Sequence, residues 1–256
     1  MKNILLVFFM ALAISVSAKD PSPFYYEIRV YRLADAADET RMDAYLEKAL
    51  VPALHRMGVK NVGVFKPVKE DTIYNKRIYV LIPYKSLTEF EKTNATLLKD
   101  AQYLTAGSDY INASHTDAPF VRLETILLKS FRFMLAPAVP NLKAPKQERV
   151  YELRSYEGAT EKLYQSKVHM FNEGGEIKLF NRLNFNAVFY GEVLSGSSMP
   201  NLMYMTSFEN KADRDAHWKS FGEAPEWKAM VVLPQYQNTV SKNTQFLLNP
   251  TSYSDF

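Results

Sequence analysis

The sequence has no cysteine, only nine glycines and no strong excess of charge of either sign. The absence of cysteine excludes disulfides, thiolate metal sites, iron–sulfur clusters and a cysteine nucleophile. The few glycines form no phosphate-binding loop or dinucleotide fingerprint, which argues against a nucleotide-binding protein. The net charge of +3, with basic and acidic residues interleaved, argues against a nucleic-acid partner.

The 256 residues have the hydrophobic content of an ordinary globular protein, at 47%, and are 13% aromatic. This composition predicts a folded chain of one large domain or two small ones. The four histidines show no zinc-ligand spacing, so we expect no metal site.

The first eighteen residues have the pattern of a secretory signal peptide. Lys2 supplies the positive start, and an apolar run from Ile4 to Ile14, too short to span a bilayer, is followed by small residues up to Ala18. We expect cleavage after Ala18 and no membrane span in the mature protein. An exported chain without cysteine indicates a bacterial protein of the periplasm or one that is secreted.

The rest of the chain repeats itself. The segment YEIRVY at 26–31 recurs as YELRSY at 151–156, an offset of 125 residues. The same offset aligns 61–65 with 186–190 and 78–80 with 203–205, and therefore pairs Tyr79 with Tyr204. We interpret this as a duplicated domain. Three prolines in ten residues mark a linker between the copies.

We therefore predict a first domain over 19–135, a linker over 136–147 and a second domain over 148–256. In each copy the periodicity predicts strand, helix, two strands, helix and strand. The expected strands are 24–32, 61–68, 76–84 and 121–131, then 149–157, 185–194, 201–208 and 240–248. This order is the ferredoxin-like βαββαβ unit, in which two helices cover one face of the sheet. The other faces of the two sheets can pack together, which gives an α+β barrel in the manner of a dimer.

Local signals place the helices. An apolar stripe from Met42 to Met57 predicts the first helix, and Pro52 within it predicts a kink or a division into two. Ser86 and Glu89 form a capping box that begins the next helix. In the second copy, Gly174 and Gly175 interrupt the first helix.

Alternation along the first strand of each copy separates two sets of side chains. We expect the more apolar set, with Tyr26 and Ile28, to pack under the helices. The polar set should then project into the space between the two sheets. This set, our candidate ligand-binding residues, consists of Glu27, Arg29, Tyr31, Glu152, Arg154 and Tyr156. Its members either form ion pairs that fix the register of the half-barrels or line a polar cavity whose arginine holds an anionic or carbonyl oxygen.

These residues also carry a family resemblance. The strand at 151–156 resembles the opening strand of NIPSNAP domains, and so does the segment DRDAHWKSF at 213–221 with APEW at 224–227. The resemblance covers the second copy and, more loosely, the first. It implies tandem domains with the dimeric α+β barrel fold, in a family without an established general activity. Relatives in this fold include cofactor-free monooxygenases and haem-binding proteins, whose activities a shared fold does not transfer.

Four hypotheses about function follow. The first is a barrel that binds a small apolar or aromatic ligand between its half-sheets. The second is a cofactor-free oxygenase or isomerase that uses Glu152, Arg154, Tyr156 and His169, since Tyr and Arg can stabilise an enolate-like anion. The third is haem binding through His169, although we otherwise expect no cofactor. The fourth is an interaction module that forms a homo-oligomer.

Overall fold

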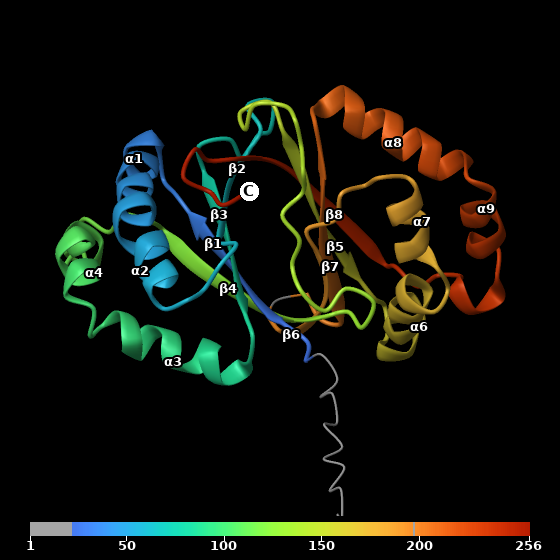
Figure 1. Cartoon of the computed structure of the whole chain (residues 1–256), viewed down its shortest axis with the longest axis horizontal. Helices are drawn as coiled ribbons and strands as arrows, with labels where there is room; N and C mark the ends of the chain where they lie inside the picture. The colour runs from blue at the N-terminus through green and yellow to red at the C-terminus, as the bar shows by residue number, and fades with distance from the viewer. Residues whose placement is uncertain (1–21, 197) are drawn as a thin grey trace, which may run out of the picture.

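A computed structural model describes residues 22–196 and 198–256 (Figure 1). The predicted signal peptide at 1–18 lies outside this range. Within the described residues, none of the helices combines the length and the apolar character needed to cross a membrane.

Each half of the chain has the predicted order of elements. The first half consists of β1 (Tyr25–Arg32), α1 (Ala36–Tyr45), the π-helical turn η1 (Leu46–Leu50), α2 (Val51–Arg56), β2 (Gly63–Pro67), β3 (Arg77–Tyr84), α3 (Leu87–Leu97), α4 (Ala101–Ala106), α5 (Ser108–Ile111) and β4 (Arg122–Ser130). The second half consists of β5 (Val150–Glu157), α6 (Glu161–Asn172), α7 (Glu176–Arg182), β6 (Phe189–Ser195), β7 (Asn201–Phe208), α8 (Lys211–Glu223), α9 (Pro225–Val231), the 3₁₀ turn η2 (Pro234–Tyr236) and β8 (Lys242–Pro250).

The predicted helix signals act as expected. The stripe that contains Pro52 is divided, because the π-helical turn η1 separates α1 from α2 and Pro52 lies in the first turn of α2, where its missing N–H is harmless. Ser86 caps α3 by accepting a hydrogen bond from the Glu89 N–H at 3.2 Å. Gly175, at φ 99°, lies at the break between α6 and α7.

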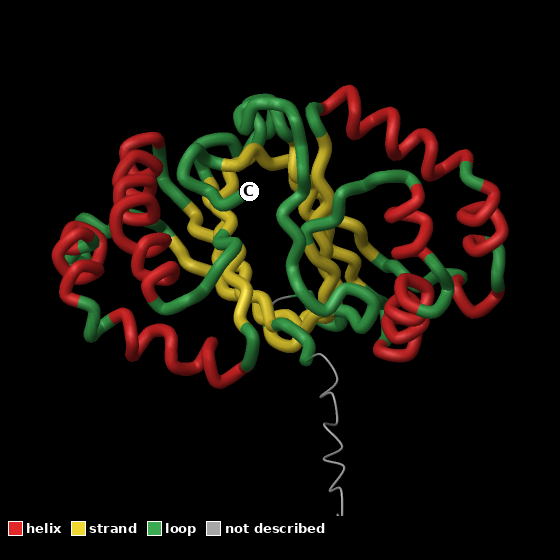
Figure 2. Tube along the Cα trace, in the orientation of Figure 1, coloured by secondary structure: helices red, strands yellow, loops and turns green. Residues whose placement is uncertain are grey.

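The eight strands form one closed barrel in the order β1-β3-β2-β8-β5-β7-β6-β4, with every neighbouring pair antiparallel. Each half contributes a four-stranded sheet, and the sheets join edge to edge through β2–β8 and β4–β6. The helices lie outside the strands, those of the first half on one side and those of the second half on the other (Figures 1 and 2). The predicted α+β class with two ferredoxin-like units is therefore confirmed.

The inside of the barrel is apolar and aromatic at one end. The ring of Phe256, the last residue, is 1% exposed and lies 5.8 Å from the ring of Phe65. Across the barrel, the rings of Tyr26 and Phe189 are 5.0 Å apart. The C-terminus thus closes the end at which β1 and β5 begin.

The structure corrects the constant offset of the repeat. Arg29 on β1 lies opposite Val80, whereas Arg154 on β5 lies opposite Tyr204. The equivalent of Tyr204 is therefore Val80, at an offset of 124, and pairing Tyr204 with Tyr79 was wrong. Tyr79 faces the barrel interior and Tyr204 faces the helices.

Candidate functional site

The predicted direction of the polar strand residues was wrong. The apolar set, with Tyr26 and Ile28 in the first half and Tyr151 and Leu153 in the second, faces the barrel interior. The polar set faces the helices instead; it comprises Glu27, Arg29, Tyr31, Glu152, Arg154 and Tyr156. In a closed barrel covered by helices both faces of a strand are buried, so the more apolar face does not identify the helix side.

Glu152 is the centre of a buried network beneath the helices of the second half. Its carboxylate is fully buried and accepts hydrogen bonds from Arg154 Nε at 2.8 Å, from Arg214 Nη2 at 2.6 Å and from Trp218 Nε1 at 2.5 Å. Burial raises the pKa of Glu152, but the hydrogen bond from Arg214 and the charges of both arginines outweigh burial and hold that pKa below its ordinary value.

The network continues along β5. Arg154 Nη1 donates to the Tyr156 hydroxyl at 2.9 Å, and this hydroxyl lies 2.8 Å from the Tyr204 hydroxyl. The Arg154 guanidinium also lies 3.7 Å from the centroid of the Trp218 ring, a cation–π distance. Every polar group of Arg154 and Tyr156 named here is therefore turned toward other groups of the protein.

The first half has a simpler version of the network. Arg29 donates to both carboxylate oxygens of Glu27, at 2.8 and 3.1 Å, and the Tyr84 hydroxyl donates to the same carboxylate at 3.0 Å. Tyr31 is fully buried, and its hydroxyl has no hydrogen-bond partner among the described residues.

These networks have the geometry of structural ion pairs. Among the described residues, five of the cavities have volumes of about 170 to 620 Å³, and none of the six polar strand residues lines these five. A role in ligand binding or catalysis for Glu27, Arg29, Tyr31, Glu152, Arg154 and Tyr156 stays a prediction.

His169 is separate from the network. It lies on α6, is exposed, and its Nδ1 lies 2.8 Å from the Tyr236 hydroxyl. It lines a cavity of about 620 Å³ together with Glu173 and Glu192. In residues 22–196 and 198–256, no three metal-binding side chains cluster. Haem binding through His169 stays a prediction.

The second end of the barrel holds a cavity of about 270 Å³, which we call the barrel mouth. Its walls are apolar and come from both halves of the chain, and its edge is polar. The walls are formed by Ile28, Val30, Tyr79, Ile126, Leu153, Met203 and Phe246. The edge is formed by Arg32, Arg77, Glu124, Ser155, Glu157, Ser198, Asn201, Lys242 and Thr244.

Two of the three cations at the barrel mouth are paired. Arg32 forms an ion pair with Glu124, and Lys242 Nζ lies 3.5 Å from a carboxylate oxygen of Glu157. Arg77 differs, because its Nη1 donates to the Tyr79 hydroxyl at 3.4 Å and no ion pair to it occurs among the described residues. The mouth therefore combines an apolar interior with one cation that has no counter-charge.

The barrel mouth was not predicted from the sequence. Its apolar walls are the alternate strand residues that we expected to face the helices, such as Ile28 and Leu153. The signal that could have found them is the polar character of the last strand residues, since Arg32 and Glu157 end β1 and β5.

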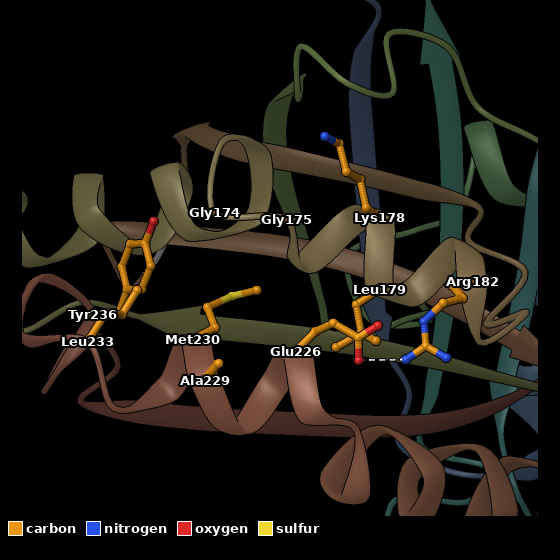
Figure 3. Close-up of a pocket in the computed structure, with 10 residues that line it drawn as sticks. All are labelled: Gly174, Gly175, Lys178, Leu179, Arg182, Glu226, Ala229, Met230, Leu233 and Tyr236. Carbon is orange, nitrogen blue, oxygen red and sulfur yellow. Dashed lines mark hydrogen bonds and ion pairs between the residues drawn. The ribbon is translucent and has the colours of Figure 1, made fainter.

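A further cavity, of about 520 Å³, lies between α7 and α9 (Figure 3). Tyr236 lies at one end, and an ion pair between Arg182 and Glu226, at 2.8 Å, lies at the other. Met230 and Leu179 line the cavity between these two ends.

Residues 151–255 match the NIPSNAP family model. The second half of the chain is a NIPSNAP domain. The match includes nearly all of β5, which carries Glu152 and Arg154, and the helix α8, which carries Arg214 and Trp218. The predicted resemblance is thus confirmed for this half, while the first half shares the order of its strands and helices.

Several solved structures share the fold over both halves of the chain. A candidate monooxygenase from Lactobacillus acidophilus is 13% identical, with a TM-score of 0.59, over 90% of this chain and 94% of its own. A candidate monooxygenase from Fusobacterium nucleatum is 8% identical, with a TM-score of 0.55, over 90% of this chain and 93% of its own. An anthrone oxidase-like protein is 9% identical, with a TM-score of 0.51, over 90% and 92%. At these identities the likeness establishes the fold alone. No curated protein matches the sequence.

Proposed function

We propose that this protein binds a small apolar molecule with an anionic group in the barrel mouth. The single observation that carries the proposal is the difference between the two ends of the barrel. One end is closed by the packed rings of Phe65, Tyr151 and Phe256, whereas the other is open over about 270 Å³. Ligand sites are typically concave and mainly apolar, with a few polar groups that fix orientation.

The walls determine how such a molecule would lie. Leu153 and Met203 are 1% and 3% exposed and form part of the apolar interior, so the apolar body of the ligand enters first. Its anionic group remains at the edge beside Arg77, whose guanidinium lies 6.0 Å from the centroid of the Phe246 ring. A flat aromatic acid or a short fatty acid has this chemistry.

Titration with 8-anilinonaphthalene-1-sulfonate tests the proposal, because this dye has an aromatic body and a sulfonate. We expect saturable fluorescence enhancement by the native chain. Val30→Phe places an aromatic ring in the mouth and should weaken binding about tenfold or more, because the ring occupies space that the ligand needs; a tenfold change corresponds to about 1.4 kcal/mol. Arg77→Met should weaken the binding of the sulfonate but not of an uncharged naphthalene.

Val139→Phe is the matched control, because Val139 is 46% exposed and lies in the linker, away from the barrel mouth. Near-UV circular dichroism should show that both phenylalanine variants keep native packing, since the dye also binds partly folded chains. Equal affinities of the native chain, Val30→Phe and Val139→Phe would contradict the proposal.

The enzyme hypothesis receives less support from the geometry. Glu152, Arg154 and Tyr156 pair with one another and their neighbours, while catalysis requires groups that reach a common point in a cavity. Haem binding is tested by adding haemin to the protein; a Soret band that His169→Ala abolishes would support it.

We also propose that the protein is exported and loses residues 1–18. N-terminal sequencing of the protein from its native host should begin at Lys19; a chain that keeps Met1 would contradict export by cleavage. Formation of a homo-oligomer stays a prediction that light scattering across concentrations tests.

A further inference from the structure

The two halves of the chain differ in chemistry beneath their first helices. Asp35 caps α1 and Thr160 caps α6, which makes positions 125 residues apart equivalent along these helices. By this equivalence, Lys167 in the second half occupies the place of Met42 in the first. Met42 is fully buried, and Lys167 is only 4% exposed.

The next helix shows the same change. The hydrogen bonds that end α2 and α7, Val59 N–H to Leu54 O and Phe185 N–H to Phe180 O, are equivalent at an offset of 126. Glu176 therefore occupies the place of the fully buried Leu50. Two buried apolar residues of the first half are thus replaced in the second half by a lysine and a glutamate.

These two replacements form an ion pair that the fold does not require. Lys167 Nζ lies 2.8 Å from Glu176 Oε2, and the two side chains are 6% and 3% exposed. Removing two charges from water is costly, and apolar residues of similar volume often serve the fold as well or better. In the first half of this chain, the apolar residues Met42 and Leu50 occupy the two equivalent positions.

The Lys167–Glu176 pair is neutral and lies beneath the same helices as the Glu152 network. Beneath the second-half helices, the cations Arg154, Arg214 and Lys167 face the carboxylates Glu152 and Glu176. Asp215, about half exposed, is a further partner of Arg214, but it lies at the surface and also pairs with Lys211. The positive excess among these five residues is therefore the charge of Arg214, for which Asp215 is the second partner.

The cavity between α7 and α9 (Figure 3) is lined by neighbours of this pair and not by the pair itself. Gly175, which lines the cavity, precedes Glu176 in the chain. Lys167 Nζ lies 3.4 Å from Met170 Sδ and 5.6 Å from the centroid of the Trp227 ring. Met170 and Trp227 pack in turn with Met230, which forms the cavity wall. Flexible methionine side chains are thus the barrier between the cavity and the lysine.

We propose that the α7–α9 cavity binds a small apolar carboxylate whose charged group reaches Lys167 when the Met230 side chain turns aside. The apolar lining of Leu179 and Leu233 accommodates the body of the ligand. The Lys167 ammonium is a charged hydrogen-bond donor, which favours an anion over a cation or a neutral molecule. This site is separate from the barrel mouth, because the two cavities share no residue.

The test is quenching of tryptophan fluorescence by 4-iodobenzoate, whose heavy atom quenches tryptophans that it contacts. The chain has two tryptophans, and Trp227 lies beside Lys167. We expect saturable quenching of the native chain by 4-iodobenzoate and only weak, linear quenching by the neutral 4-iodobenzamide.

The decisive variant is the double change Lys167→Met/Glu176→Leu, which installs the residues of the first half and so should fold. It should weaken the saturable quenching at least about tenfold, because a charge-assisted hydrogen bond is lost. Ala229→Phe, which fills the cavity and leaves the pair intact, should weaken it too. Lys162→Met on the exposed face of α6 is the matched control and should not.

Saturable quenching that survives both the double variant and Ala229→Phe would overturn the proposal, as would quenching that never saturates. Val30→Phe, which fills the barrel mouth, should leave the quenching unchanged. The proposed function and this inference can therefore fail independently.

Discussion

The most informative perturbation of the buried network is Glu152→Gln. The change keeps the size of the side chain. Among the described residues, it removes the only carboxylate that Arg154 contacts and one of two that Arg214 contacts. Breaking a buried ion pair by removing one partner typically costs 3–5 kcal/mol. Because the Arg214 side chain is 15% exposed and keeps Asp215, we expect the lower part of this range, about 3–4 kcal/mol.

For a chain of this length, such a loss lowers the melting temperature by roughly 6–16 °C. Thermal and urea unfolding followed by circular dichroism would measure it. Glu226→Gln is the matched control, because its ion pair with Arg182 is about half exposed on both sides and should contribute almost nothing. If Glu152→Gln unfolds within 2 °C of the native chain, the buried network does not stabilise this fold as described.

Three further predictions follow from the same structure. Stability should fall as pH drops below 4.5, the ordinary pKa of a glutamate, because the folded-state pKa of Glu152 is depressed; Glu152→Gln should lose this part of the pH profile, and an unchanged acid limb would contradict the assignment. Lys167→Met alone should cost about 3–5 kcal/mol, whereas Lys167→Met/Glu176→Leu should be as stable as the native chain at pH 8, measured by urea midpoints. Glu176→Leu should restore the stability that Lys167→Met loses. Burial raises the pKa of Glu176, so the ionised carboxylate destabilises the fold above that pKa, and the leucine removes this cost. Phe256→Ala should cost about 3 kcal/mol, because it leaves a void among Phe65 and Tyr151, and calorimetry that shows no loss would mean that the C-terminus does not close the barrel.

The fold was predictable because the sequence repeats and contains local signals for where helices begin and break. Ser86 and Pro52 give local signals that need no knowledge of the rest of the chain. The two copies of the βαββαβ order predicted the pairing of two sheets. The register between the copies was not predictable. The π-helical turn at 46–50 and the break at Gly174 and Gly175 lie where the offset rises to 126, and the unequal connections from β2 to β3 and from β6 to β7 lower it to 124.

The candidate site was only partly predictable. Alternation identified Glu152 and Arg154 as a polar pair on one strand face, and they do pair, at 2.8 Å. Alternation could not say which face meets the helices, since both faces are buried. Arg214 and Trp218 join the same carboxylate from a helix more than sixty residues away, and only tertiary packing brings them there.

The barrel mouth depends even more on tertiary structure. Its walls combine alternate residues from several strands, such as Val30, Leu153 and Phe246, that no sequence pattern groups together. The two halves, moreover, are not chemically equal. Lys167 and Glu176 became informative only after the structure identified Met42 and Leu50 as their equivalents.

A crystal structure of the chain soaked with 8-anilinonaphthalene-1-sulfonate would decide whether the open end of the barrel is the ligand site that we propose. We expect the naphthalene ring between Leu153 and Met203, with the sulfonate beside Arg77. Density for the dye at another surface, with the mouth filled by the protein's own side chains, would contradict it.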